Sequence, residues 1–389
     1  MIFSRRLPAQ FEANPFTQSI EEIRRSGRSF LDLTVSNPTE TGLEYPTREI
    51  RAALASDPFP YAPHPRGDRS AREAVSALGG KSGRIIDPAN VWLTSGTSEG
   101  YAYLAKLLAD PGQEIAIPTP SYPLFSHLFA LEGVTAVPYP LRYAEGWMID
   151  WEGLERSVSE RTRGIVVVNP NNPTGHFTPR AEVDRLLSFC ERRGIALIAD
   201  EVFFEFPLAD RERVSFARPD SPALTFVLDG LSKIVGLPQC KLSWISAHGP
   251  ASAVSEAADR LDWISDQYLS VGTAIQRALP ALTGAAAAVT PTIRKRVAAN
   301  NDRLREILNP TDWFRLPVVE GGWSAIVRLP DSVDEEQWVE ALLRDRAVLV
   351  YPGYFFDLPF RSSLVVSLLP EPETFREGVT RIGAARDGW

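Results

Sequence analysis

The chain has 389 residues, of which 44% are hydrophobic and 23% charged, and its formal net charge at pH 7 is −8. This length is too great for one small core, so we expect a large domain together with a smaller one. The acidic balance disfavours a nucleic-acid partner, because binding to phosphates needs a clustered basic surface.

The composition also bears on the compartment. No apolar run approaches the length of a membrane span, and Pro8, Gln10 and Glu12 follow the basic start of the chain, where a signal peptide would be apolar. Cys190 and Cys240 are too few for a disulfide framework. We therefore expect a cytoplasmic protein without membrane contact. The four histidines lack the spacing of metal ligands, so we expect no metal site.

Short β-rich runs alternate with helical patterns between about residues 90 and 250, which predicts a largely parallel sheet covered by helices on both faces. A helix around Thr17–Arg25 precedes this region. Runs such as Ile165–Val168 are continuously apolar, as in a strand that is buried on both faces. The helix pattern Arg180–Arg193 ends at Gly194, a residue typical of helix C-termini. The seven expected strands are Val91–Thr94, Glu114–Pro118, Thr135–Pro138, Gly164–Asn169, Ile195–Asp200, Thr225–Leu228 and Leu242–Ala247.

A helix-rich stretch from Ser252 to about Leu308 leads into a second unit. There the pattern predicts strands and helices that make a small α+β domain: strands Ser324–Leu329, Val348–Tyr351 and Ser363–Leu369, and helices Glu335–Arg344 and Glu373–Arg386. We expect residues 1–45 to be an arm or part of the small domain, residues 46–285 the large domain, and residues 286–389 the small domain.

Polar residues follow the strands at the edge where ligands bind in open α/β sheets. A Ser-Gly-Thr turn comes after the first strand and opens a helix, whose free N–H groups and positive dipole end would attract an anion. A rigid turn after the fourth strand could hold an amide in place. The residues concerned are Ser95-Gly96-Thr97, the turn Pro170–Gly175 with Asn172, Asp200 at the end of the fifth strand, and Ser232-Lys233 after the sixth.

An anion cradle, an amide, a carboxylate and a lysine at one edge of a sheet are the groups that pyridoxal phosphate needs. The lysine would form a Schiff base and later move a proton, and the carboxylate would keep the ring nitrogen protonated. Each signal alone has an ordinary structural explanation: Ser-Gly-Thr occurs in turns, Asp200 could cap a helix, and Ser232-Lys233 could be a solvated pair. The ordered set on successive strand ends favours the cofactor.

Over nearly its whole length the chain resembles the class I/II aminotransferases, which are pyridoxal-phosphate enzymes of fold type I. The segments that carry the resemblance are Asp32–Pro38, Tyr61 with Gly67 and Arg72, Ser95-Gly96-Thr97, Pro120–Pro123, Asn169–Gly175, Ala199–Val202 and Ser232-Lys233. The resemblance implies a large domain with a mostly parallel seven-stranded sheet between helices, and a small α+β C-terminal domain.

The resemblance also implies a role for each matching residue. Lys233 would carry pyridoxal 5'-phosphate and shuttle the proton, Asp200 would pair with the pyridine nitrogen, and Asn172 would donate to the phenolic oxygen. Tyr122 would stack on the ring, although it could instead be a core aromatic residue. A homodimer with shared active sites is implied as well. The residues expected at the phosphate are Ser95, Gly96, Thr97, Ser232 and Lys241, with Tyr61 reaching the phosphate of the neighbouring subunit.

Two positions near the cofactor depart from the family's pattern. Phe203 stands where the family usually has a tyrosine that hydrogen-bonds the phenolic oxygen. Lys241 stands where an arginine clamps the phosphate, and a lysine supplies a point charge instead of a bidentate fork.

A third departure concerns the substrate. Val365 stands where the family places an arginine that binds the α-carboxylate of the substrate. Arg361 is the first candidate to replace it, and Arg328 is a weaker one. Asn37, in the N-terminal segment that resembles the family, is a further candidate for contact with the substrate.

The function expected is transamination between an amino acid and a 2-oxo acid. A β-lyase, decarboxylase or synthase of the same fold would share every cofactor contact, so the motifs do not separate these reactions. An effector-binding module of a transcription regulator would need a DNA-reading domain, and no basic N-terminal extension is long enough to form one. The intact Lys233 and Asp200 disfavour a pseudo-enzyme.

Overall fold

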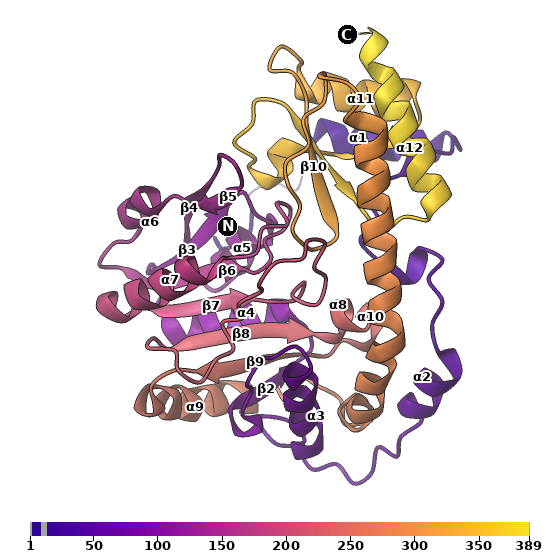
Figure 1. Cartoon of the computed structure of the whole chain (residues 1–389). Coiled ribbons are helices and arrows are strands. Elements are labelled where there is room, and N and C mark those ends of the chain that lie inside the picture. The colour runs from indigo at the N-terminus through magenta and orange to yellow at the C-terminus, as the bar shows by residue number, and fades with distance from the viewer. Residues whose placement is uncertain (1, 9–13, 389) are drawn as a thin grey trace.

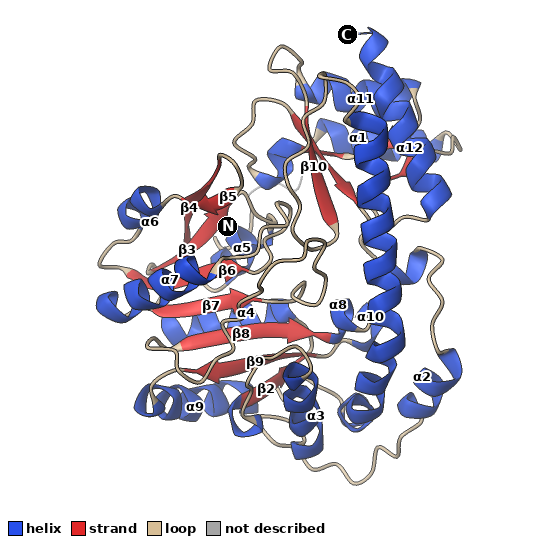
Figure 2. Cartoon of the chain, in the orientation of Figure 1, coloured by secondary structure: helices blue, strands red, loops and turns tan. Residues whose placement is uncertain are grey.

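A mostly parallel sheet lies at the centre of the larger part of the molecule (Figure 2). The computed structural model describes residues 2–8 and 14–388. Within these residues the sheet has eight strands, which lie side by side in the order β2 (Val91–Thr94), β9 (Ser243–His248), β8 (Thr225–Gly230), β7 (Ala196–Asp200), β6 (Thr162–Val168), β3 (Glu114–Thr119), β4 (Thr135–Tyr143) and β5 (Trp147–Ile149).

The five strands β8, β7, β6, β3 and β4 pair in parallel, whereas β9 is antiparallel to both of its neighbours and β5 is antiparallel to β4. The seven strands predicted from the sequence are all present, and the α/β fold class is confirmed. The additional strand is β5, a three-residue partner of β4, whose hairpin pairs Leu141 with Ile149. So short a segment carries too little alternation to be recognised in the sequence.

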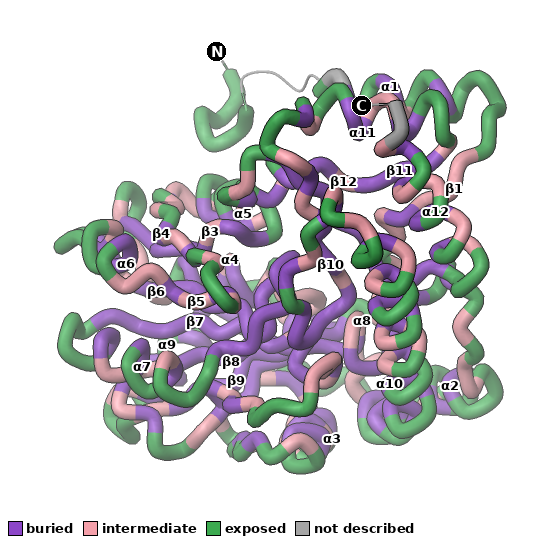
Figure 3. The backbone as a smooth tube through the Cα atoms, turned by 45° about the horizontal axis from the view of Figure 1, so that its top comes forward, coloured by how far each residue is buried: buried purple, intermediate pink, exposed green. Residues whose placement is uncertain are grey.

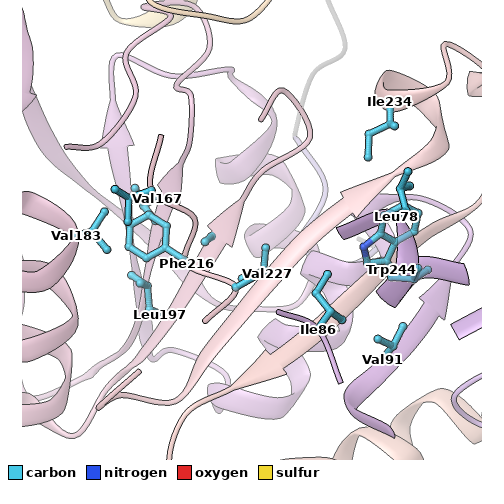
Figure 4. Packing of buried hydrophobic residues seen from close by; sticks show 14 of the residues in the cluster. Leu78, Ile86, Val91, Val167, Val183, Leu197, Phe216, Val227, Ile234 and Trp244 are labelled. Atoms are coloured by element: carbon cyan, nitrogen blue, oxygen red, sulfur yellow. The ribbon is translucent and has the colours of Figure 1, made fainter. Parts of the chain in front are cut away.

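Helices cover both faces of this sheet (Figure 1). The side chains of β8 show this, because Val227 packs into one buried cluster while Phe226 and Leu228 pack into the other. Figure 4 shows the first cluster, in which Val227 lies with Leu197 and Val167 along the sheet. The helices in this larger part of the molecule are α2 (Thr47–Leu54), α3 (Arg69–Gly80), α4 (Thr97–Leu108), α5 (Leu124–Leu131), α6 (Trp151–Ser157), α7 (Arg180–Arg193), α8 (Leu231–Ile234) and α9 (Ala251–Asp266).

The predicted end of α7 is confirmed. Gly194 has a φ of 62°, in the left-handed region that glycine adopts at little steric cost, and its N–H closes the last turn on Cys190 and Glu191. Strand β7 follows directly, so this turn sets where the strand begins and where Asp200, its last residue, comes to lie.

A smaller α+β unit lies beside the large sheet (Figure 1). Its central sheet has the order β10 (Ser324–Arg328), β13 (Ser363–Ser367) and β12 (Tyr351–Pro352), with antiparallel pairing. The N-terminal segment belongs with this unit, because β1 (Leu31–Asp32) pairs in parallel with β11 (Val348–Leu349). The helices of the unit are α1 (Pro15–Arg25), α11 (Glu335–Asp345) and α12 (Pro372–Ala384).

The long helix α10 (Thr273–Leu308) runs beside both units (Figure 1). It packs against α2 and α3 near the large sheet and against α12 in the smaller unit. The helix is continuous through residue 285, where the sequence predicted the large domain to end, and that boundary stays a prediction.

Most strands of the large sheet are buried, whereas β4 near its edge is partly exposed and the outer turns are exposed (Figure 3). Among residues 2–8 and 14–388, no helix combines the length and the apolar composition that crossing a bilayer would require.

Candidate active site

A cavity of about 230 Å³ opens between the large sheet and the smaller unit. It lies at the carboxyl ends of β7 and β8, the edge at which the sequence predicted a site. The large sheet and its helices contribute Thr97, Tyr122, Asn172, Asp200 and Lys233 to its lining, and the smaller unit contributes Trp323, Ser324, Tyr351, Val365 and Ser367.

Lys233 lies on α8, the short helix that directly follows β8. Its Nζ atom is 5.3 Å from the centre of the Phe203 ring and 5.0 Å from that of Trp323. Burial among such rings lowers the pKa of Lys233 to about 8, and the attraction of Asp200 opposes only part of that shift. A lysine with such a pKa has far more neutral amine near neutral pH than an ordinary lysine, so it can act as a nucleophile or a base.

Asp200 is the buried last residue of β7. One oxygen, Oδ1, accepts the backbone N–H of Val202 at 3.2 Å, and the other, Oδ2, accepts the hydroxyl of Tyr101 at 2.9 Å. Burial raises the pKa of Asp200, and the two hydrogen bonds and the charge of Lys233 oppose the rise. The sequence did not single out Tyr101. The only indication of Tyr101 in the sequence is that it comes four residues after Thr97, which places both side chains on the same side of a helix.

Of the three asparagines in the segment Asn169–Gly175, only Asn172 lines the cavity. Asn169 and Asn171 are buried, and their amides bond to the surrounding loops, for example Asn169 Nδ2 to the Val214 carbonyl at 3.0 Å. Asn172 lines the cavity, and its Oδ1 accepts the hydroxyl of Ser324 at 3.1 Å. Since that bond occupies the oxygen, the NH₂ group of Asn172 is the part of the amide left to donate to a ligand.

The Ser-Gly-Thr turn and Lys241 come together at the N-terminus of α4. A Cβ atom placed on Gly96 would lie 3.3 Å from Lys241 Nζ, so the ammonium group lies directly beside the turn. Thr97 lines the cavity, whereas Ser95 and Ser232 are partly buried outside its lining. The backbone N–H of Ser95 donates to Glu99 at 2.7 Å.

Two departures from the family's pattern lie in the wall of the cavity. Phe203 stacks edge-on against Trp323, with ring centres 5.3 Å apart. Val365 is 2% exposed, and its neighbours across the smaller sheet are Ile326 and Tyr351. Tyr122 lies at the mouth of the cavity with 49% of its surface exposed.

Four further predicted residues also lie outside the lining of this cavity. Tyr61 is 69% exposed and borders a separate depression. Asn37 accepts the N–H of Thr39 at 3.1 Å and thereby caps a 3₁₀ turn. Arg361 is exposed in an acidic depression, and Arg328 stacks 4.1 Å from the ring centre of Phe360.

These residues fit the chemistry of pyridoxal phosphate. A helix N-terminus beside Lys241 matches the phosphate, the free NH₂ of Asn172 matches the phenolic oxygen, and the Asp200 carboxylate matches the ring nitrogen. Lys233 supplies an amine for the aldehyde.

Comparison with known sequences points to the same chemistry. The sequence model of the family described as aminotransferase class I and II matches residues 28–382. An alanine aminotransferase of Mycobacterium tuberculosis is 28% identical over 384 residues, which cover 95% of this chain and 88% of that protein. A glutamate-pyruvate aminotransferase of Escherichia coli is 22% identical over 383 residues, which cover 96% of this chain and 95% of that protein.

Solved structures share the fold. An alanine aminotransferase from Pyrococcus furiosus matches with a TM-score of 0.88 at 22% identity, over 100% of both chains. A double mutant of the aspartate aminotransferase of Thermus thermophilus matches with a TM-score of 0.84 at 25% identity, over 98% of this chain and 99% of that one. Since the family match runs through every strand that ends at the cavity, the chain belongs to the class I and II aminotransferases, a family of pyridoxal-phosphate enzymes.

Proposed function

We propose that the cavity between the two sheets is where the enzyme moves an amino group between an amino acid and a 2-oxo acid, with Lys233 as the Schiff-base residue. The position of Lys233 carries this proposal. The residue reaches the cavity from α8, burial lowers its pKa to about 8, and Asp200 lines the same cavity. The resemblance of the chain to aminotransferases over most of its length supports the reaction class.

Each residue around the cavity has a distinct task in this proposal. When bound, pyridoxal phosphate supplies an electron sink for the bonds at the amino-bearing carbon. Asp200 holds a proton on the ring nitrogen, and Asn172 donates to the phenolic oxygen. Thr97 and Lys241 bind the phosphate. Lys233, once released by the incoming amine, takes the proton from the substrate carbon and returns it.

The test is a half-reaction with the purified holoenzyme and a panel of amino acids. Alanine and glutamate come first, because relatives are named as alanine and glutamate-pyruvate aminotransferases. The expected result is conversion of the cofactor to pyridoxamine phosphate, seen in the absorption spectrum, with release of the 2-oxo acid. Release of pyruvate and ammonia without that conversion would instead identify a β-lyase and contradict the proposal.

We also propose a homodimer in the cytoplasm. The exposed aromatic ring of Tyr61 and the resemblance to the family support shared active sites. Light scattering and sedimentation would test whether the enzyme is a dimer. Cys190 and Cys240 are both free, which fits a reducing compartment.

Lys241→Gln is expected to weaken binding of the cofactor about tenfold, because it removes the charge that lies beside Gly96. Lys241→Arg should keep the charge and most of the affinity. Dissociation constants of pyridoxal phosphate for the two variants, measured by fluorescence titration, check this. Equal affinities in the wild type and Lys241→Gln would show that the lysine does not contact the phosphate.

Phe203→Tyr is expected to lower the pKa of the Lys233 nitrogen in the holoenzyme. A new hydroxyl that donates to the phenolic oxygen would weaken that oxygen's hold on the proton shared with the nitrogen. A spectroscopic pH titration of both proteins measures the change. If the pKa does not fall, the phenolic oxygen already has another donor in the wild type, and Phe203 serves only to pack against Trp323.

A further inference from the structure

Tyr101 is the one side chain that donates to Asp200 in the hydrogen bonds of residues 2–8 and 14–388. The bond runs from the tyrosine hydroxyl to Oδ2 and is 2.9 Å long. It joins α4 to the end of β7, two elements that are far apart in the sequence. Both side chains line the cavity and both are at least nine-tenths buried.

The ring of Tyr101 is held so that its hydroxyl stays in this place. It packs edge-on against Phe125 and Phe129 of α5, with ring centres 5.1 and 6.1 Å away. A ring fixed by packing loses little further entropy when its hydroxyl bonds to Asp200. The hydroxyl also remains a donor over the working pH range, because burial raises the pKa of Tyr101 well above its usual value.

Helix α4 links this bond to the phosphate site. Thr97 begins the helix and Tyr101 follows one turn later, so the two side chains lie on the same side of the helix. Both line the cavity. One rigid element therefore places the anion site and the donor to Asp200 at a set separation.

The chemistry of the donor matters as much as its position. A buried carboxylate without donors would favour its neutral form and could not pair with a protonated ring nitrogen. A cation in the place of Tyr101 would neutralise the carboxylate instead. A neutral hydroxyl stabilises the charge and leaves it available, because each carboxylate has about four lone-pair sites and two donors occupy only half of them.

From this geometry we propose that Tyr101 is a positioning residue, which keeps Asp200 ionised and oriented toward the ring nitrogen of the cofactor. The inference rests on the proposed role of Asp200. Without the hydroxyl the carboxylate becomes more basic and takes a larger share of the proton that it should leave on the ring nitrogen. The electron sink then weakens while substrate binding is unchanged.

The test compares Tyr101→Phe with Tyr139→Phe. Tyr139 is also buried and also donates one hydrogen bond, to the Val166 carbonyl at 2.7 Å, but it does not line the cavity. In the cofactor-free protein, the pKa of Asp200 can be followed by infrared spectroscopy of its carboxyl band, assigned by its loss in Asp200→Asn. Tyr101→Phe is expected to raise this pKa by about one unit, the size of a lost hydrogen bond to a charged group, and Tyr139→Phe to leave it unchanged.

The holoenzyme gives the second readout. Tyr101→Phe should lower kcat about tenfold with little change in KM, and 4-aminophenylalanine at position 101, which keeps an N–H donor in place, should restore most of the loss. An unchanged Asp200 pKa in Tyr101→Phe, or no recovery with 4-aminophenylalanine, would overturn the inference. Because the infrared titration needs no cofactor and no substrate, its result stands even if the proposed reaction proves wrong.

Discussion

Lys233→Ala is expected to leave a folded protein that has lost essentially all turnover. The side chain extends into the cavity beyond the short helix α8, so its removal leaves the strands of the large sheet and the apolar clusters on its two faces intact. Turnover fails because one residue both binds the cofactor and moves the proton, and loss of such a group costs about 10⁴-fold or more. Steady-state kinetics and the melting temperature measure the two effects.

Lys233→Arg is the matched control. It keeps a positive charge between Phe203 and Trp323, but a guanidinium group neither forms a Schiff base nor loses its proton at working pH. Both variants should therefore be inactive. Near-normal turnover in either one would contradict the assignment of Lys233 and with it the whole reading of the cavity.

Asp200→Ala is expected to lower kcat by about 10²–10³-fold. The carboxylate opposite the ring nitrogen stabilises the protonated ring mainly in the transition state, so its loss slows the reaction more than it weakens substrate binding. Stability should change far less than activity, because removal of the carboxylate relieves the cost of a buried charge while it leaves the Tyr101 hydroxyl without its acceptor. Single-turnover measurement of proton removal from the substrate, with its deuterium isotope effect, separates this step from binding. Asp200→Glu keeps the charge but displaces it, so it should lie between the wild type and Asp200→Ala. A loss of only a few-fold in Asp200→Ala would mean that the ring nitrogen has another partner.

The arrangement of the large sheet could be predicted because its central strands, such as β6, β7 and β8, are buried on both faces. A short, continuously apolar run such as Ile165–Val168 is typical of a strand that is buried on both faces. The two-residue strand β1 could not be found in the same way. It exists because Leu31 and Asp32 pair with Val348 and Leu349, more than three hundred residues later, and no local pattern contains that pairing.

Part of the candidate site could also be predicted from the sequence, and part of it could not. Lys233, Asp200 and Asn172 follow strand ends, so the order of strands alone predicted one shared edge, and all three line the cavity. Ser324 and Trp323 come from the smaller unit and reach Asn172 and Lys233 across the cavity. The predicted substrate residues Asn37 and Arg361 lie outside the lining, because a position along a strand does not tell which way a neighbouring loop turns.

Local sequence determined the longer helices and strands of this protein and the residues at their ends, since apolar periodicity, helix termini and strand-end motifs all act within a few residues. Tertiary structure alone decided what surrounds each of those residues. Burial lowers the pKa of Lys233 to about 8, and Phe203 and Trp323 from distant parts of the chain lie beside it. Asp200 has a hydroxyl donor because Tyr101 on α4 reaches the end of β7. Burial and hydrogen bonding depend on groups brought together from distant parts of the chain, so they come into being only when the chain has folded.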